Sequence, residues 1–397
     1  MKTEADIRIN TRISTGELER RWGAVRQAMK ERGLDFLIMQ GYTDILGGYI
    51  KWFTDLPALN NYTTTVIFAR EEEMTTIWHG GFPPAKPSPP EWAVRGVKKR
   101  ISVPTIPSLD YSNIFHAEKV VEELKQYNSC RIGLVGMGFI SAVFYKYINK
   151  QLTGAKFEEA TDLVDDIKAI KSEEEIRYIK ETCEMQDAVF EYILTRIQPG
   201  RTDHEVCADV THKCEELGGT RTNIIGISAP AGKAAALMPV PFDNRTIENG
   251  DQFNLLIEAN GPSGFWTEVQ RIVCLGKIPQ ELADQFEICK QAQKATLDAL
   301  KPGITPSSVL DVNNEFMRSK GYPAETRIYA HGMGYDMVER PAITHEEKMV
   351  LRAGMNLAVH PAVVSAKAAA HVCENYIIQE TGAPLCLHKT PQKLFSI

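Results

Sequence analysis

The chain has 397 residues, 43% of them hydrophobic and 24% charged, which is the composition of a folded protein with room for more than one domain. Its net charge of -6 argues against a nucleic-acid-binding surface, because phosphate binding needs a concentrated basic face. The N-terminus opens no apolar stretch and no apolar run approaches ~20 residues, so neither a signal peptide nor a membrane span is expected. Eight cysteines without a C-x-x-C pair predict reduced core thiols and a cytoplasmic protein.

The first part of the chain alternates between helical and strand patterns. Leu18, Trp22, Val25 and Met29 recur at helical spacing before a stop at Gly33. Strands are predicted at 34–39, 63–69, 74–78 and 131–136, and the proline-rich stretch 80–90 is predicted to be an irregular loop. This alternation predicts a sheet covered by helices, an α/β domain over residues 1–163.

The second part, residues 164–397, contains an internal repeat. The segment 197–206 matches the segment 300–309 at a Pro-Gly pair, a threonine and a valine. Each copy follows one amphipathic helix and precedes another, so a helix that stops at Pro-Gly and restarts at Thr202 or Thr305 is used twice. The repeat predicts a pseudo-symmetric second domain.

Acidic residues and histidines lie inside apolar strands of this second domain, where a buried charge needs a partner or a metal. The runs 253–261 and 264–273 predict a β-hairpin that brings Glu258 towards Glu268. Further along, His331 opens a His-Gly-x-Gly motif, and a last strand pair carries His360 and Glu374. Strand alternation places His371 and Cys373 differently from Glu374, so we expect neither of those two to be a ligand.

The order of these motifs resembles the five-motif signature of the creatinase/aminopeptidase P/methionine aminopeptidase superfamily, family M24, with its pita-bread fold. The resemblance covers roughly residues 165–385. It implies a creatinase- or prolidase-like α/β domain followed by a pseudo-symmetric pita-bread domain, and a homodimer. The segments that carry it are Gly250-Asp251, the Glu258/Glu268 hairpin, His331-Gly-x-Gly with Glu339 and Pro341, Gly354-Met355 through His360-Pro361, and Glu374.

The resemblance also implies a set of metal ligands. Peptidases of this superfamily hold two metal ions with Asp, Asp, His, Glu and Glu, and the corresponding residues here are Glu258, Glu268, His331, His360 and Glu374. All three changed positions keep a side chain that can ligate, and two imidazoles among carboxylates suit Fe, Mn or Zn better than Mg or Ca. We therefore expect a re-tuned divalent transition-metal site. The alternative is a metal-free polar pocket like that of creatinase, with Glu258 and Glu268 as a hydrogen-bonded carboxylate pair.

Two histidines that serve the scissile amide in the superfamily have no counterpart here, where Met238 and Val338 stand at or near their positions. Because general acid–base help contributes ~10²–10⁴-fold, we expect peptidase activity to be lost. The expected function is metal-dependent hydrolysis of a C–N bond in a small polar non-peptide molecule, with water as the nucleophile. A metal-dependent lyase resembling dimethylsulfoniopropionate lyase, a metal-free creatinase-like amidinohydrolase, an Xaa-Pro peptidase and a non-catalytic binding protein stay open.

The remaining site residues follow from the same resemblance. Arg271 corresponds to an arginine that braces the site, and it joins three residues of the ligand set as candidate catalytic residues: Glu268, Glu374, Arg271 and His331. Arg221, Arg327 and Tyr329 lie in segments expected to border the pocket and bind substrate. In creatinase-type dimers the first domain leans over the neighbour's pocket, so Trp52 is expected to contact a substrate there, with ~0.5–2 kcal/mol per cation–π contact.

Overall fold

The computed structural model describes residues 12–57, 61–80, 89–127, 129–238 and 243–397. They form two compact units, Arg12–Lys168 and Ala169–Ile397. The division falls at 168/169 rather than at the expected 163/164, because helix α5 (Thr161–Lys168) packs into the first unit, where Tyr49 Oη donates a hydrogen bond to Asp165 Oδ1 at 2.8 Å. Within the described ranges, no helix is long and apolar enough to cross a bilayer.

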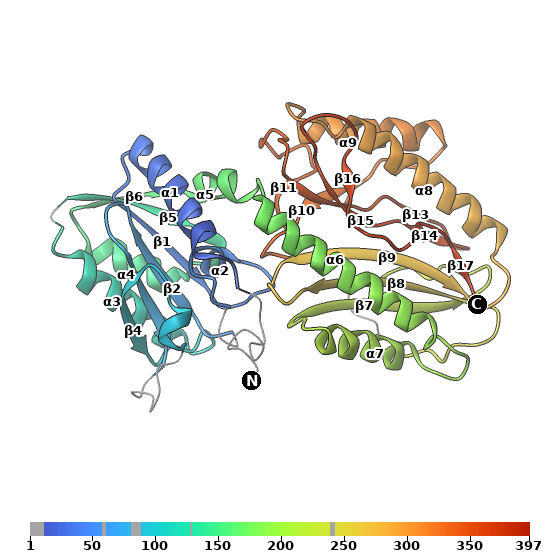
Figure 1. The fold of residues 1–397 in the computed structure, drawn as a ribbon, viewed down its shortest axis with the longest axis horizontal. Coiled ribbons are helices and arrows are strands. Elements are labelled where there is room, and N and C mark those ends of the chain that lie inside the picture. Colours follow the sequence, from blue (N-terminus) through green and yellow to red (C-terminus); the bar gives the residue numbers. More distant parts are fainter. Residues whose placement is uncertain (1–11, 58–60, 81–88, 128, 239–242) are drawn as a thin grey trace. The chain divides into compact units, whose positions relative to one another are not determined.

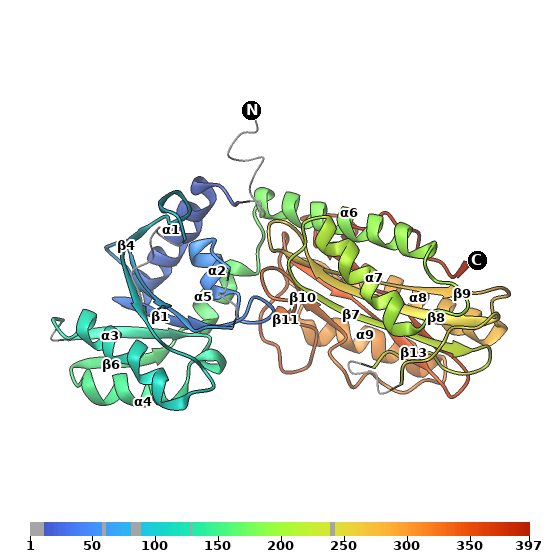
Figure 2. The ribbon, with the colours of Figure 1, turned by 90° about the horizontal axis from the view of Figure 1, so that it is seen from below.

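The first unit is an α/β domain built on a six-stranded mixed sheet with the strand order β4-β3-β2-β1-β5-β6 (Figure 1). Both views show the sheet between α1, α2 and α5 on one side and α3 and α4 on the other (Figures 1 and 2). Besides α5, its helices and strands are α1 (Thr15–Arg32), β1 (Phe36–Gly41), α2 (Tyr49–Thr54), β2 (Thr64–Ala69), β3 (Met74–His79), β4 (Val97–Val103), α3 (Ile114–Leu124), β5 (Cys130–Val135), α4 (Ala142–Gln151) and β6 (Ala155–Glu159).

Local signals in the sequence set the first helix and strand. The side chain of Ser14 accepts a hydrogen bond from the Glu17 amide and so caps α1, and Gly33 ends the helix with a φ of 69°. The strands predicted around β1, β2, β3 and β5 are confirmed. Most of the stretch expected to be a proline-rich loop, residues 81–88, lies outside the described residues.

Trp52 lies in the core of the first unit rather than on a surface that could reach a substrate. All six residues of α2 are buried, and 1% of Trp52 is exposed. Its backbone carbonyl accepts a hydrogen bond from Arg21 Nη1 at 2.9 Å, and its ring packs edge-on against Phe53. The expectation that Trp52 binds substrate is therefore wrong: the short helix turns its aromatic side chains into the domain to bury apolar surface.

The second unit contains two larger sheets, with strand orders β17-β9-β8-β7 and β11-β10-β12-β15-β16, and the two-stranded sheet β13-β14. Helices α6 and α7 cover the four-stranded sheet, and α8 and α9 lie over the strands that follow them (Figures 1 and 2). The elements are α6 (Glu173–Leu194), α7 (Asp203–Glu216), β7 (Thr222–Pro230), β8 (Asp251–Asn260), β9 (Trp266–Cys274), α8 (Gln280–Ala299), α9 (Pro306–Ser319), β10 (Ala330–Gly332), β11 (Glu339–Ala342), β12 (Asn356–Val359), β13 (Ala362–Val364), β14 (Ala369–His371), β15 (Glu374–Ile377), β16 (Leu385–Cys386) and β17 (Phe395–Ser396).

The internal repeat forms two equivalent helix pairs. Gly200 and Gly303 adopt φ values of 89° and 88° after α6 and α8. Thr202 and Thr305 then cap α7 and α9 through their side-chain oxygens. Each helix pair leads into antiparallel strands, so the predicted pseudo-symmetry is confirmed.

Strand register determines which side chains meet between the two sheets. In the β8–β9 hairpin Glu258 stands directly opposite Glu268, as predicted. The two sheets touch at an isolated bridge between Gln270 and Cys373. Directly paired residues point to the same side of a ladder, so this bridge aims Cys373 at the face of β9 that carries Glu268 and Gln270.

Candidate metal centre

Three predicted ligands converge where the two sheets meet. Glu268 of β9, His331 of β10 and His360, which follows β12, each offer a ligand atom within 4.8 Å of the other two. The His331 Nε2 atom lies 3.6 Å from Glu268 Oε2, and the two imidazole rings are 5.1 Å apart between centroids. One carboxylate and two imidazoles form a donor set typical of Fe, Mn or Zn sites.

Both imidazoles can offer a ring nitrogen to a metal ion. His331 Nδ1 lies 3.1 Å from the carbonyl oxygen of Gly332, which only accepts, so Nδ1 donates to this oxygen and Nε2 is the ring nitrogen that faces Glu268. Burial lowers the pKa of His360 to about 4, so its ring is neutral at pH 7. A divalent ion brings its ligands to about 2 Å, so small side-chain adjustments would let these three residues hold one.

Glu258 lies beside this group without belonging to it. Its carboxyl contacts Glu268 across the hairpin and accepts a hydrogen bond from Asn223 Nδ2. Burial, together with the charge of Glu268, raises the pKa of Glu258 to about 8. Glu258 is therefore a protonated carboxylic acid at neutral pH when Glu268 is ionised.

Cys373, which strand alternation led us to leave out of the ligand set, contacts Glu268 directly. Its thiol donates a hydrogen bond to Glu268 Oε1 at 2.9 Å. Burial raises the pKa of Cys373 well above its ordinary value, so the thiol stays protonated and acts as a donor. The bridge to Gln270 determines this orientation, and the sequence alone gives no sign of a pairing between such distant strands.

Glu374 points to the opposite side of the strand from Cys373, and its carboxylate is paired with other residues. Its Oε1 forms an ion pair with Arg271 Nη2 at 2.8 Å, and both side chains are almost fully buried. Its Oε2 accepts hydrogen bonds from Gln293, Tyr376 and Gln392 at 3.1, 3.2 and 2.8 Å. The structure therefore separates Glu374 and Arg271 from the other candidate catalytic residues. Arg271 has a bracing geometry, because it also donates to the carbonyl oxygens of Thr390 and Pro391.

Glu268, His331 and His360 line a cavity of about 440 Å³. Arg327 lines it, although its guanidinium is already paired with Glu325 at 2.7 Å. Tyr329, expected to border the pocket, is completely buried and bonded to Thr296 instead, while Arg221 sits at the start of β7 and does not line this cavity. The lining residues are Ile225, Ala236, Leu237, Leu256, Glu258, Glu268, Gln270, Arg327, His331, His360, Ala362, Val364, His371 and Cys373.

The positions of the two absent histidines differ in the structure. Met238 is exposed and does not line the cavity, although its neighbour Leu237 does. Residues 239–242, the rest of that segment, lie outside the described ranges. Val338 is half-buried and also stays outside the cavity lining.

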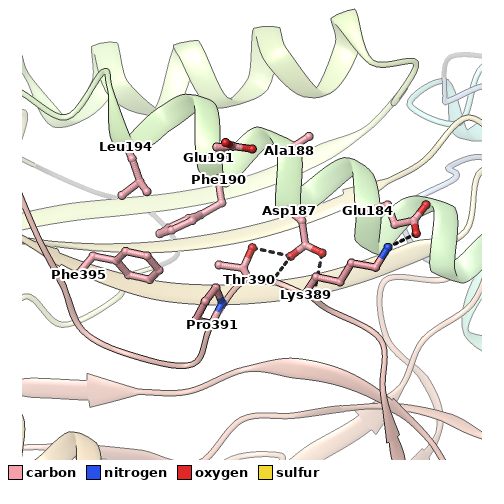
Figure 3. A pocket seen from close by; sticks show the side chains of 10 residues that line it. All are labelled: Glu184, Asp187, Ala188, Phe190, Glu191, Leu194, Lys389, Thr390, Pro391 and Phe395. Carbon is pink, nitrogen blue, oxygen red and sulfur yellow. Dashed lines mark hydrogen bonds and ion pairs between the residues drawn. The ribbon is translucent and has the colours of Figure 1, made fainter.

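A larger cavity, of about 620 Å³, lies along α6 and is lined by residues of the C-terminal segment (Figure 3). Asp187, Lys389 and Thr390 of its lining are paired with one another or with Glu184. Asp187 accepts from the amides of Lys389 and Thr390 at 2.8 and 2.9 Å, and the Lys389 ammonium pairs with Glu184 at 2.5 Å (Figure 3). These contacts attach the C-terminal segment to α6, and among the residues that the structure describes no group of three ligating side chains converges in this cavity.

Residues 177–380 match the family model described as metallopeptidase family M24, and this span is more than half of the chain. The chain belongs to metallopeptidase family M24. Two relatives named Xaa-Pro dipeptidase, from Pyrococcus horikoshii and Pyrococcus furiosus, are each 25% identical to it. Their alignments cover 73% and 77% of this chain and 84% of each relative.

Solved structures of dipeptidases and aminopeptidases share the fold over nearly the whole chain. The Xaa-Pro dipeptidase from Bacillus anthracis matches with a TM-score of 0.77 at 19% identity, covering 96% of this chain and all of that one. The X-Pro aminopeptidase from Thermotoga maritima matches with a TM-score of 0.75 at 21% identity, covering 95% of this chain and 99% of that one. The expected α/β domain followed by a pita-bread domain is thus confirmed.

Membership of M24 supports a hydrolase with a divalent metal and agrees with the Glu268, His331 and His360 group. The names of the relatives give no support to the expectation that peptidase activity has been lost. They favour the Xaa-Pro peptidase, which is one of the alternatives that the sequence left open.

Proposed function

We propose that this chain is a metal-dependent hydrolase of an acyl C–N bond in a small substrate held in the cavity beside Glu268, His331 and His360. The observation that carries the proposal is the convergence of these three ligating side chains at the wall of an M24 cavity. A divalent cation held there would polarise the acyl carbonyl and activate water.

The chain's own residues supply the proton transfers and the positioning. Glu258 lies across the hairpin from Glu268, where its protonated carboxyl can give its proton to the leaving nitrogen and regain one from the attacking water. The Cys373 thiol holds one oxygen of Glu268 and leaves Oε2 facing His331. Arg327 gives the cavity wall a cationic group that can orient a polar end of the substrate.

Two substrate classes follow from different observations. The relatives named Xaa-Pro dipeptidase place Xaa-Pro dipeptides first among the substrates to test. The residues at Met238 and Val338, in place of histidines that serve a peptide bond, favour a small non-peptide C–N compound as the second class. Both classes share the same reaction.

The metal part of the proposal is tested by elemental analysis of purified protein after loading with Mn, Fe, Co or Zn. We expect bound transition metal in the wild type and its loss in His331→Ala and His360→Ala. His371→Ala is the matched control: His371 lines the same cavity but lies outside the ligand group, so this variant should keep its metal. Metal loss in all three variants, or in none, would contradict the assignment.

The catalytic part is tested by turnover of a panel of Xaa-Pro dipeptides and small N-acyl compounds with each metal. Hydrolysis of at least one class, lost in Glu258→Gln by about 10²-fold or more, supports the proposal. A metal-loaded protein that hydrolyses no member of either class would overturn it.

A further inference from the structure

The cavity wall beside the metal centre carries two linked side-chain amides. Asn254 of β8 and Gln270 of β9 lie on the same face as Glu268, because residues two apart on a strand share a face and Asn254 pairs with Ile272. Both amides are buried, with 0% of Asn254 and 1% of Gln270 exposed. Gln270 lines the cavity.

A backbone carbonyl determines how both amides are oriented. Asn254 Nδ2 donates to the carbonyl oxygen of Ala235 at 2.9 Å, and a carbonyl oxygen can only accept. Asn254 Oδ1 therefore faces Gln270 and accepts from Gln270 Nε2. Turning either amide over would oppose two oxygens, so the nitrogen of Gln270 is committed to Asn254 and Oε1 is left for another donor.

Gln270 Oε1 has no hydrogen-bond partner among the residues that the structure describes. Buried polar atoms of folded proteins are nearly always hydrogen-bonded. Because Gln270 lines a cavity, its unpaired oxygen indicates that a bound molecule supplies the missing hydrogen-bond donor.

His371 adds a donor to the same wall. Its Nδ1 lies 3.4 Å from Asn254 Nδ2, which carries hydrogens, so Nδ1 accepts and the ring hydrogen belongs to Nε2. His371 also lines the cavity. The wall thus presents a hydrogen-bond acceptor from Gln270, which suits a ligand N–H, and a donor from His371, which suits a ligand carbonyl oxygen.

We propose that Gln270 is a specificity residue that accepts a hydrogen bond from an N–H group of the substrate close to the scissile acyl carbon. Amino, primary amide and ureido nitrogens satisfy Gln270 Oε1, whereas a fully alkylated nitrogen leaves it unpaired. The nearby carboxyls of Glu258 and Glu268 favour a neutral or cationic nitrogen over an anionic group. The position of the scissile carbon rests on the proposed function; the hydrogen bond to Gln270 does not.

The test compares the binding of two probes, propionamide and N,N-dimethylpropionamide, to the full chain. Their dissociation constants are measured by ligand-observed NMR titration, which requires no turnover. The wild type should bind propionamide about tenfold more tightly, the value of one hydrogen bond, and Gln270→Met should lose this preference. Gln252→Met is the matched control. Gln252 is also 1% exposed on β8, donates to a backbone carbonyl and has an unpartnered Oε1, but it does not line the cavity. This variant should keep the preference.

Equal binding of the two amides by the wild type, or a preference that survives in Gln270→Met, would overturn the proposal and indicate selection by size alone. If Gln270→Met does not fold, the Gln270→Glu variant provides the test, because its carboxylate still accepts a hydrogen bond at this position. This variant should bind propylammonium at least about tenfold more tightly than the wild type does, and unchanged binding would refute the proposal. Since both readouts are binding, failure to hydrolyse any C–N substrate would count against the proposed function alone.

Discussion

The guanidinium of Arg271 and the carboxylate of Glu374 lie 2.8 Å apart in the interior of the second unit and outside the group of Glu268, His331 and His360. Two charges buried together are stable only while both are present, because each compensates for the water that the other has lost. The pair also holds the C-terminal segment through the carbonyl oxygens of Thr390 and Pro391 and through Gln392. Its role in the described structure is to join β9 and β15 to the end of the chain.

We predict that Glu374→Gln lowers stability by about 3 kcal/mol, because it leaves Arg271 buried without a counter-charge, while the metal content stays that of the wild type. Thermal unfolding and elemental analysis of the same preparation measure the two effects. The double variant Arg271→Met/Glu374→Gln should regain part of the lost stability, since it removes both charges. Metal loss in Glu374→Gln as complete as in His360→Ala would show instead that Glu374 is a ligand.

At the scale of elements, the first unit contains a histidine that strand β2 and helix α3 bury between them. His116 of α3 is fully buried, its Nδ1 lies 2.8 Å from Thr65 Oγ1, and its Nε2 has no hydrogen-bond partner in the described part of the chain. Burial, with a smaller contribution from His79, lowers the pKa of His116 to about 3. The ring is therefore neutral in the folded state at any mildly acidic pH.

This burial predicts acid sensitivity of the first unit. The unfolded chain takes up a proton at His116 below about pH 6.5 and the folded unit does not until about pH 3, so stability is complete above the unfolded pKa and declines as the pH falls between these values. Between pH 7 and pH 5 the loss from this residue is about 2 kcal/mol. Native-state hydrogen exchange of the β1, β2 and β5 amides should show this loss in the wild type and a smaller one in His116→Gln. An equal pH dependence in both proteins would contradict the prediction.

At the scale of the whole molecule, the two units are compact by themselves, and the aromatic residues of α2 belong to the interior of the first. Trp52→Ala should destabilise that unit by about 3–5 kcal/mol, because it removes a large side chain from a packed core. At a temperature where the variant stays folded, KM for any substrate identified should equal that of the wild type. A raised KM with unchanged thermal unfolding would return Trp52 to a substrate-binding role.

The homodimer implied by the superfamily stays a prediction, and sedimentation velocity on the full chain measures it directly. A dimer is expected for the 44.4-kDa chain. A monomer with full turnover at the same concentration would show that each cavity works without a partner.

Features that depend on neighbouring residues could be predicted from the order of amino acids. Turn and cap residues such as Gly33, Thr202 and Thr305 act on their immediate neighbours, so helix limits and the repeat could be predicted from them. The short turn between β8 and β9 likewise brings Glu258 and Glu268 together by local geometry.

Which side chains face the cavity depends on packing between distant parts of the chain. Cys373 and Glu374 are neighbours in the sequence, and the bridge between Gln270 and Cys373 turns the first towards Glu268 and the second towards Arg271. A pairing one residue out of register would exchange their roles, because successive side chains on a strand point to opposite faces. That register depends on contacts between strands about a hundred residues apart, and the same long-range packing orients Gln270, which sequence patterns did not single out.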